Sequence, residues 1–253
     1  MSSARRLALG LAVLAPMALG GCLGVETTQQ KSAKKAKTAG RRLASKKGLT
    51  ITRSNLAVKV EQSAIVQDPN GVAAVVRVKN TGATQVTLPV AITVSDAHGK
   101  KLYANDIPGL DPSLVSLSVL GAGQEAYWVN NQILVAGKAG KLDARVGAAK
   151  SSTKGALPRI TLSAITSGRD ADGPYAKGIV RNESSLTQRR LVISCVARQG
   201  TAIRAAGRAV IDSLPPAASS KKPTSFTVFF IGDPKGASLA CAAPPTVLPG
   251  GTS

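Results

Sequence analysis

The sequence is poor in the residues that catalytic and metal-binding sites need. It contains one histidine, three cysteines and thirteen acidic residues among 253. A Ser-His-Asp site would have to use His98, and no Gly-x-Ser-x-Gly motif accompanies it. So few histidines and cysteines leave no set of soft ligands for zinc, and the Gly-rich phosphate-binding motifs are absent. We therefore expect no metal, no cofactor and no enzymatic activity.

Aromatic residues are scarce as well. Three Phe, three Tyr and Trp128 are the only ones, so large side chains that could anchor a core are few. The plentiful apolar residues are Ala, Val, Leu and Ile, and Val- and Thr-containing runs are broken by Gly, Pro, Asn and Asp. This composition favours strands over helices and predicts an all-β fold.

The apolar run near the start, Leu7 to Leu19, is too short to span a bilayer. It follows Arg5 and Arg6 and ends in small residues, which is typical of a secretory signal peptide. The order Leu19-Gly20-Gly21-Cys22 resembles the lipobox of bacterial lipoproteins. That resemblance implies a signal peptide at 1–21, a lipidated Cys22, and a location on the extracytoplasmic face of the cell membrane.

The positive charge is the strongest compositional feature, with a net value of +20. Residues 22–48 combine many Lys and Arg with Ser, Thr, Gln and Ala, and have few large apolar residues. We expect this segment to be a disordered basic tether, either a solubilising spacer or a contact for anionic lipid or acidic wall polymer. Export argues against nucleic acid as a partner.

The rest of the chain divides into two similar parts, expected to be domains at 49–150 and 155–249. Val78-Lys-Asn-Thr81 matches Val180-Arg-Asn-Glu183 at an offset of 102, and an apolar strand follows each. The first of these strands, 85–95, alternates strictly, although Pro89 suggests an edge or a bulge. A polar linker, 150–155, separates the parts. The pattern predicts two tandem β-sandwich domains.

The repeat resembles the FxLYD family of Ig-like β-sandwich domains found in bacterial lipoproteins. The matching features of the first part are Val78-Lys-Asn80, the turn from Asp96 to Gly99, and Leu120-Gly-Ala-Gly-Gln124. The second part matches through Gly178-Ile-Val-Arg-Asn182, Gly200 and Leu214-Pro215. The resemblance implies a non-catalytic envelope lipoprotein and transfers no catalytic residues. Position 122 is Ala where the family often has Pro.

Several residues remain as candidates for sites. With Cys22 lipidated, Cys195 and Cys241 are expected to form a disulfide, with two buried free thiols as the alternative. Tyr127 and Trp128 could form a binding platform, although a core position is the plainer interpretation. Asn105, Asp106 and Asp111 could hold calcium but are expected in a solvated loop. One basic binding face could gather the arginines of the second part, against the alternative of a scattered surface: Arg181, Arg189, Arg190, Arg198, Arg204 and Arg208.

These observations predict a membrane-anchored module that binds or adapts other components of the cell envelope without catalysis. Its partners would be the membrane, through the lipid anchor, and envelope proteins or anionic wall polymers. The first alternative is an accessory or weak hydrolase centred on His98, which would require a pocket with Asp96 and a hydroxyl directed at the imidazole. The second is a purely structural spacer.

Overall fold

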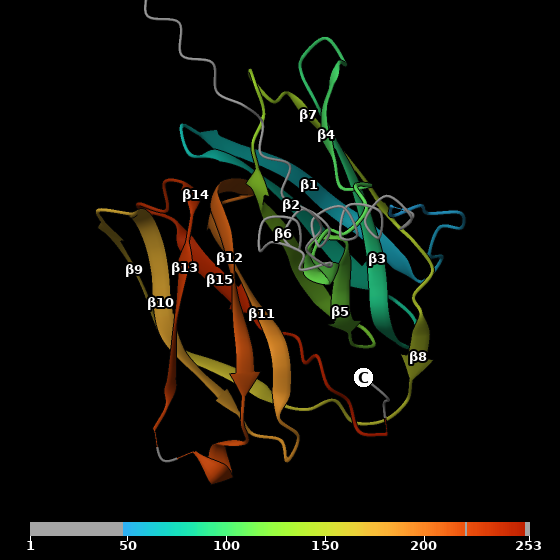
Figure 1. Ribbon diagram of the computed structural model, residues 1–253, viewed down its shortest axis with the longest axis vertical. Coiled ribbons are helices and arrows are strands. Elements are labelled where there is room, and N and C mark those ends of the chain that lie inside the picture. The colour runs from blue at the N-terminus through green and yellow to red at the C-terminus, as the bar shows by residue number, and fades with distance from the viewer. Residues whose placement is uncertain (1–47, 221, 251–253) are drawn as a thin grey trace, which may run out of the picture. The chain divides into compact units, whose positions relative to one another are not determined.

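The chain is built almost entirely of antiparallel β-strands, which confirms the predicted all-β class (Figure 1). The computed structural model describes residues 48–250 apart from residue 221. The predicted signal peptide, Cys22 and all of the predicted tether except residue 48 lie outside the described residues. Within the described part, no helix is long and apolar enough to cross a membrane.

The first half consists of two facing sheets. One has the order β1 (Val58–Asp68), β2 (Gly71–Asn80) and β6 (Glu125–Ile133). The other is centred on β3 (Thr84–Ser95), whose neighbours are β4 (Lys101–Ala104), β5 (Ser116–Leu120), β7 (Lys141–Val146) and β8 (Ser151–Thr153). A short 3-10 helix, η1 (Pro112–Leu114), precedes β5. Alternate residues of β2 and β3 meet in the core between these sheets.

The second half repeats this plan. Its first sheet has the order β13 (Thr224–Phe229), β10 (Gly173–Asn182) and β9 (Ile160–Asp170). Its second sheet has the order β14 (Ile231–Gly232), β12 (Ala202–Leu214), β11 (Gln188–Gln199) and β15 (Ser238–Ala242). A 3-10 turn, η2 (Ala217–Ser219), lies between β12 and β13. A separate hydrophobic core fills the space between these two sheets.

Equivalent buried asparagines hold corresponding points of the two halves. Asn80 Nδ2 donates to the carbonyls of Ala83, Leu120 and Gly121 at 2.8–3.1 Å. Asn182 Nδ2 donates in the same way to the carbonyls of Leu186 and Leu214, at 2.8 and 3.0 Å. The matching Asn positions therefore have a structural role, because each satisfies carbonyls where a strand of the facing sheet ends.

Of the two alternatives expected at Pro89, the edge is wrong, because β3 is the centre of its sheet. An irregularity is present: the neighbours of β3 change there from β5 and β8 to β4 and β7, and Thr87 beside it has left-handed backbone. Two further local expectations were wrong. Ser151–Thr153, expected in the linker, pairs with β3. Residues 167–170, expected in a polar loop, continue β9. The last two segments are polar because they lie at exposed sheet edges, where burial imposes no apolar alternation.

A third hydrophobic cluster, here called the seam core, joins the two halves. It combines β1, β2 and β6 of the first half with β11, β12 and β14 of the second: Val66, Ala73, Val75, Val129, Val196, Ala206 and Ile231. Residues 48–250 accordingly fall within one compact unit. Strand β2 is therefore buried on both faces. That each half folds alone stays a prediction, and the seam core argues against it, because separation would expose this apolar surface.

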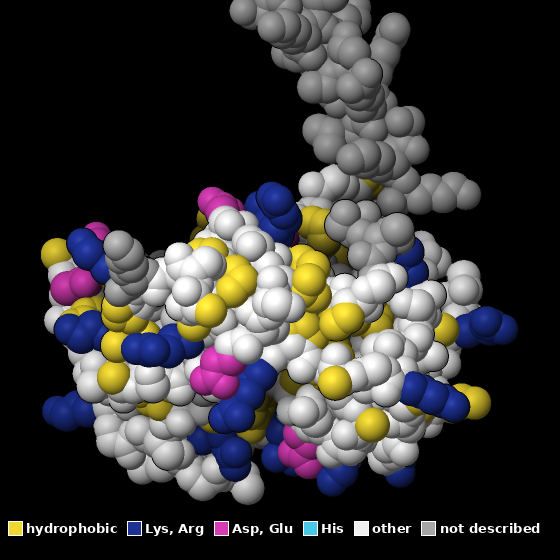
Figure 2. Space-filling model, turned by 90° about the horizontal axis from the view of Figure 1, so that it is seen from below, with side chains coloured by type: hydrophobic (Ala, Val, Ile, Leu, Met, Phe, Trp, Pro, Cys, Tyr) yellow, Lys and Arg dark blue, Asp and Glu magenta, His cyan; other side chains and the backbone are white. Residues whose placement is uncertain are grey.

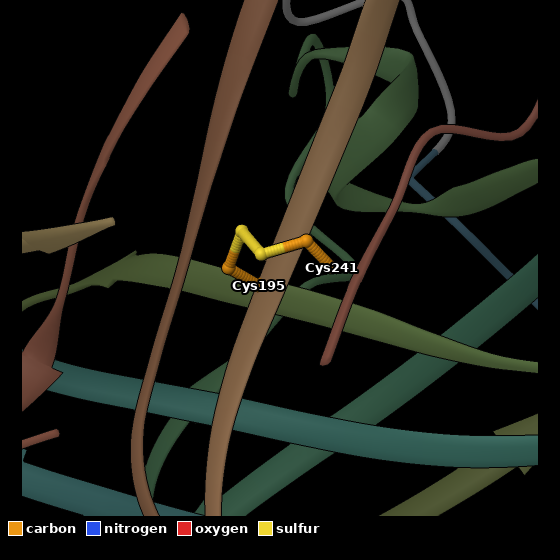
Figure 3. The surroundings of a disulfide bond; sticks show 2 residues. All are labelled: Cys195 and Cys241. Atoms are coloured by element: carbon orange, nitrogen blue, oxygen red, sulfur yellow. A yellow bond between two sulfur atoms is a disulfide. The ribbon is translucent and has the colours of Figure 1, made fainter. Parts of the chain in front are cut away.

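The predicted disulfide is present. Cys195 of β11 and Cys241 of β15 lie directly opposite each other in the antiparallel pair, with Cα atoms 4.1 Å apart and sulfurs 2.06 Å apart (Figure 3). Cys195 is completely buried in the second core, and Cys241 packs against that core. The bond therefore ties the last strand to the centre of its sheet.

Candidate functional site

A polar cluster crosses the seam at the point where η1 meets the second half. Asp111 lies immediately before η1, and its carboxylate accepts hydrogen bonds from the Ser113 amide, at 2.9 Å, and the Ser113 hydroxyl. Arg190 of β11 donates to the same carboxylate. Arg208 of β12 donates from Nη1 to the Ser113 hydroxyl. Two residues of the first half are thus bound by two arginines of the second.

Burial and neighbouring charges shift the pKa values of Asp111 and Arg208. Partial burial alone would raise the pKa of Asp111, but the Ser113 hydrogen bonds and the charges of Arg190 and Arg208 together lower this pKa below its usual value. Burial lowers the pKa of Arg208, and the Asp111 charge opposes this effect. Arg208 is buried, with a relative exposure of only 9%. The cluster is therefore an ionised site partly withdrawn from water.

A cavity of about 220 Å³ adjoins this cluster and is lined by both halves. Leu117, Trp128 and Val129 form its wall on the first half, and Val192 with Ser194 lines it on the second. Its polar lining includes other hydroxyls and the charged groups at the cluster: Thr87, Ser113, Ser116, Ser118, Thr246, Asp111, Arg189 and Arg190. Apolar walls with a few convergent polar groups are the usual composition of a ligand site. We call this space the seam cavity.

The backbone beside the seam cavity is strained at two equivalent positions. Thr87 of β3 and Arg190 of β11 have φ angles of 51° and 49°, and each precedes a fully buried leucine, Leu88 or Leu191. Left-handed backbone in a side chain other than Gly, Asn or Asp is uncommon and costs on the order of 1–3 kcal/mol. Ala164 of β9 has a similar φ of 50° away from the cavity, at a shift in the β9–β10 register, so this backbone form marks strand irregularities of the fold as well as the two cavity walls.

The chain after β15 forms another wall of the seam cavity and is held by one glutamine. Gln188 is fully buried, and its Oε1 accepts from the amides of Thr246 and Val247 at 2.8 and 3.0 Å. Its Nε2 donates to the Val247 carbonyl at 3.2 Å. Because Pro244 and Thr246 line the seam cavity, Gln188 fixes the position of that wall.

The structure divides the six candidate arginines among three places. Arg189, Arg190 and Arg208 meet at the seam cavity or its cluster. Arg198 and Arg204 lie near the β11–β12 hairpin, toward the other end of the same strands, and Arg181 is exposed on β10 of the facing sheet. Figure 2 shows Lys and Arg side chains spread over the visible face, with acidic side chains beside some of them. The six arginines therefore do not form one surface.

The remaining candidates have structural surroundings. His98 is exposed, and the Asp96 carboxylate accepts from the backbone amides of His98 and Lys100 at 2.9 Å, so Asp96 stabilises the turn. This geometry gives no argument for a hydrolase at His98. Trp128 has a relative exposure of 2% and belongs to the first core, while its edge lines the seam cavity.

The three calcium candidates are engaged elsewhere. Asn105 is buried and bonds the backbone of Val90, Ile92 and Leu114. Asp106 lies 3.4 Å from Lys101, and Asp111 serves the seam cluster. Ser113, Ser194 and the seam cavity itself were not foreseen, because they depend on how two distant segments pack together.

The chain matches no model of a known protein family, and no match was found among curated proteins. The resemblance to FxLYD domains therefore stays a prediction.

Proposed function

We propose that this chain is a lipid-anchored, extracytoplasmic module that binds a ligand without catalysis, and that the seam cavity is its binding site. The observation that carries the proposal is the cavity of about 220 Å³ with Trp128 on one side and Arg190 on the other. A spacer would need no such space between its halves, because packed protein surfaces usually meet at crystal-like density. The lipobox residues support the anchor at Cys22.

The anchor has a direct test. The chain with Cys22 intact is expected in the membrane fraction with a diacylglyceryl-modified N-terminal cysteine, detected by mass spectrometry. A Cys22→Ser variant should lose both the modification and membrane retention, because one covalent lipid contributes about 0.8 kcal/mol of membrane affinity per buried methylene. A mature chain that begins at another residue would contradict this part of the proposal.

The binding role needs a test that depends on the cavity. Ser194 is buried and lines the space, so Ser194→Phe should fill much of it. Small molecules released from natively purified wild-type protein are expected by mass spectrometry and should be missing from the variant. An exposed change on the facing sheet, Ser225→Phe, is the matched control. Identical released molecules from all three proteins would contradict binding in the seam cavity.

A further inference from the structure

We propose that the seam cavity takes a small carboxylate that carries a compact apolar group. This inference rests on the proposed binding function and assigns the chemical class of the ligand.

The charge beside the cavity is unbalanced. Two arginines, Arg189 and Arg190, and one carboxylate, Asp111, are among the described residues that line the cavity, and Arg208 lies beside it on Ser113. Asp212 lies 3.9 Å from Arg190, but its side chain is 91% exposed. Within residues 48–250, Arg189 has no carboxylate partner. An anion would reduce this imbalance at the mouth of the cavity, where Arg189 and Arg190 are exposed, and beside Arg208, where burial leaves less water to screen its charge.

Arg208 adds an independent argument. More than nine-tenths of its surface is buried, yet its Nε has no hydrogen-bond partner among the described residues. Its Nη1 reaches the hydroxyl of Ser113, which lines the cavity. A buried guanidinium with an unsatisfied donor is costly, so a second negative charge near Ser113, besides that of Asp111, would stabilise it further. Arg208 would therefore act through Ser113 as a positioning residue.

The walls and the size narrow the class of anion. Leu117, Trp128 and Val192 offer apolar contact beside the charged groups, so the ligand needs an apolar part next to its charge. A space of about 220 Å³ suits a small ligand, or the end of a larger one, because the cavity is only partly closed. A doubly charged phosphate would lose more hydration than a carboxylate on entering apolar walls. A planar carboxylate also matches the fork of an arginine.

The test uses Trp128, the only tryptophan of the chain, as a reporter inside the cavity. Phenylacetate, phenylacetamide, benzylamine and phenyl phosphate are titrated into the purified full chain while indole fluorescence is followed. Phenylacetate is expected to bind at least about tenfold more tightly than the amide or the amine, and its affinity should fall at high salt. A tetrapeptide ending in phenylalanine, with a free or an amidated C-terminus, shows whether a chain end can supply the same carboxylate.

Variants identify the groups responsible. Arg189→Gln should weaken phenylacetate binding about tenfold, because a charge-assisted hydrogen bond is lost, and Arg189→Lys should restore part of it. Arg208→Lys should lower the ratio of phenylacetate affinity to phenylacetamide affinity, and should lower the phenylacetamide affinity itself by a smaller factor. Arg181→Gln, an exposed arginine on the facing sheet, is the control and should change neither value.

The outcomes separate this inference from the proposed function. Equal binding of acid, amide and amine, abolished by Ser194→Phe, would overturn the carboxylate class and leave a binding cavity. Tighter binding of phenyl phosphate than of phenylacetate would likewise overturn it. If no probe changes Trp128 fluorescence, the carboxylate inference fails, while the ligand-release comparison with Ser194→Phe still decides whether the cavity binds anything.

Discussion

The two halves share one plan but use the equivalent sheet in opposite ways. The inward residues of β2 and β10 are buried in both: Val72, Ala74, Val76 and Val78 in the first, and Pro174, Ala176, Gly178 and Val180 in the second. On the outer face, Ala73 and Val75 of β2 are fully buried in the seam core. The residues 102 positions later, Tyr175 and Lys177, are half-buried and exposed.

This difference follows the packing of the two sheets: the apolar outer face docks, and the face with a charged side chain stays in water. The apolar outer face of β1-β2-β6 packs on β11 and β12, while the β9-β10-β13 face carries Lys177 beside the ring of Tyr175, 5.8 Å from its centroid. A charged side chain on a sheet face prevents another sheet from packing there, because the charge would lose its hydration. Duplication of one unit can thus give a two-part body with a single interface.

The largest effect is expected when the outer face of the first sheet receives the lysine found on the second. Val75→Lys places an unpaired ammonium in the seam core and should lower the free energy of unfolding by about 3–5 kcal/mol. The reverse change, Lys177→Val, alters an exposed position and should stay within about 0.5 kcal/mol. Urea unfolding followed by circular dichroism gives both values. An unchanged midpoint for Val75→Lys would show that the seam core does not form in solution.

Much of the fold could be predicted from the sequence, because strand periodicity and turn residues are local signals. The alternation on β3, the duplicated Asn and the cysteine pair each led to a correct element. The seam core was missed, although the continuous run Val72-Ala-Ala-Val-Val76 carries its signal: a strand buried on both faces has no polar alternation. Which sheet would cover that second face depends on packing between distant segments, and no local pattern encodes it.

The seam cavity was harder to predict because it arises where the repeat is broken. The second half has one long strand, β12, where the first has β4, η1 and β5. The break supplies Asp111 and Ser113, in a segment that the sequence predicts only as a solvated loop. Asp111 was considered only as a calcium ligand, and its pairing with Arg190 was not foreseen because the two residues lie 79 positions apart in the sequence.

A smaller effect is expected from removing the disulfide, which the first half lacks. At the position where β11 carries Cys195 opposite Cys241, β3 has Ile92 opposite Ala144. Replacing both cysteines with Ala should lower stability by about 2–4 kcal/mol, since the bond closes a loop with a sequence separation of 46.

The strands in which stability is lost show whether the two halves unfold together or separately. Hydrogen exchange should show faster opening in β11 and β15, and the seam core should carry part of the change to β2. Exchange altered throughout the second half but unchanged in β2 would indicate that the halves unfold separately. Complete labelling of both thiols in the native, unreduced protein would rule out the bond itself.

The smallest expected effect concerns the polar part of the seam. The pKa of Asp111 is lowered in the folded protein, so its ionised form stabilises the fold at pH values above the usual 3.8. That contribution is fully present at neutral pH and is lost as the pH falls below 3.8 through the lowered value. Asp111→Asn should therefore cost on the order of 1 kcal/mol at neutral pH, because Arg190 is largely exposed and water screens the pair.

The pH dependence of this difference separates charge from packing. Urea midpoints of wild type and Asp111→Asn, measured from about pH 7 to about pH 3, should converge on the acid side as the wild-type carboxylate takes up its proton. Asp212→Asn removes the exposed carboxylate 3.9 Å from Arg190 and should change stability little at any of these pH values. A constant difference between wild type and Asp111→Asn would assign the loss to the Ser113 hydrogen bonds. The apolar seam core would then hold the halves together without a contribution from the ion pair.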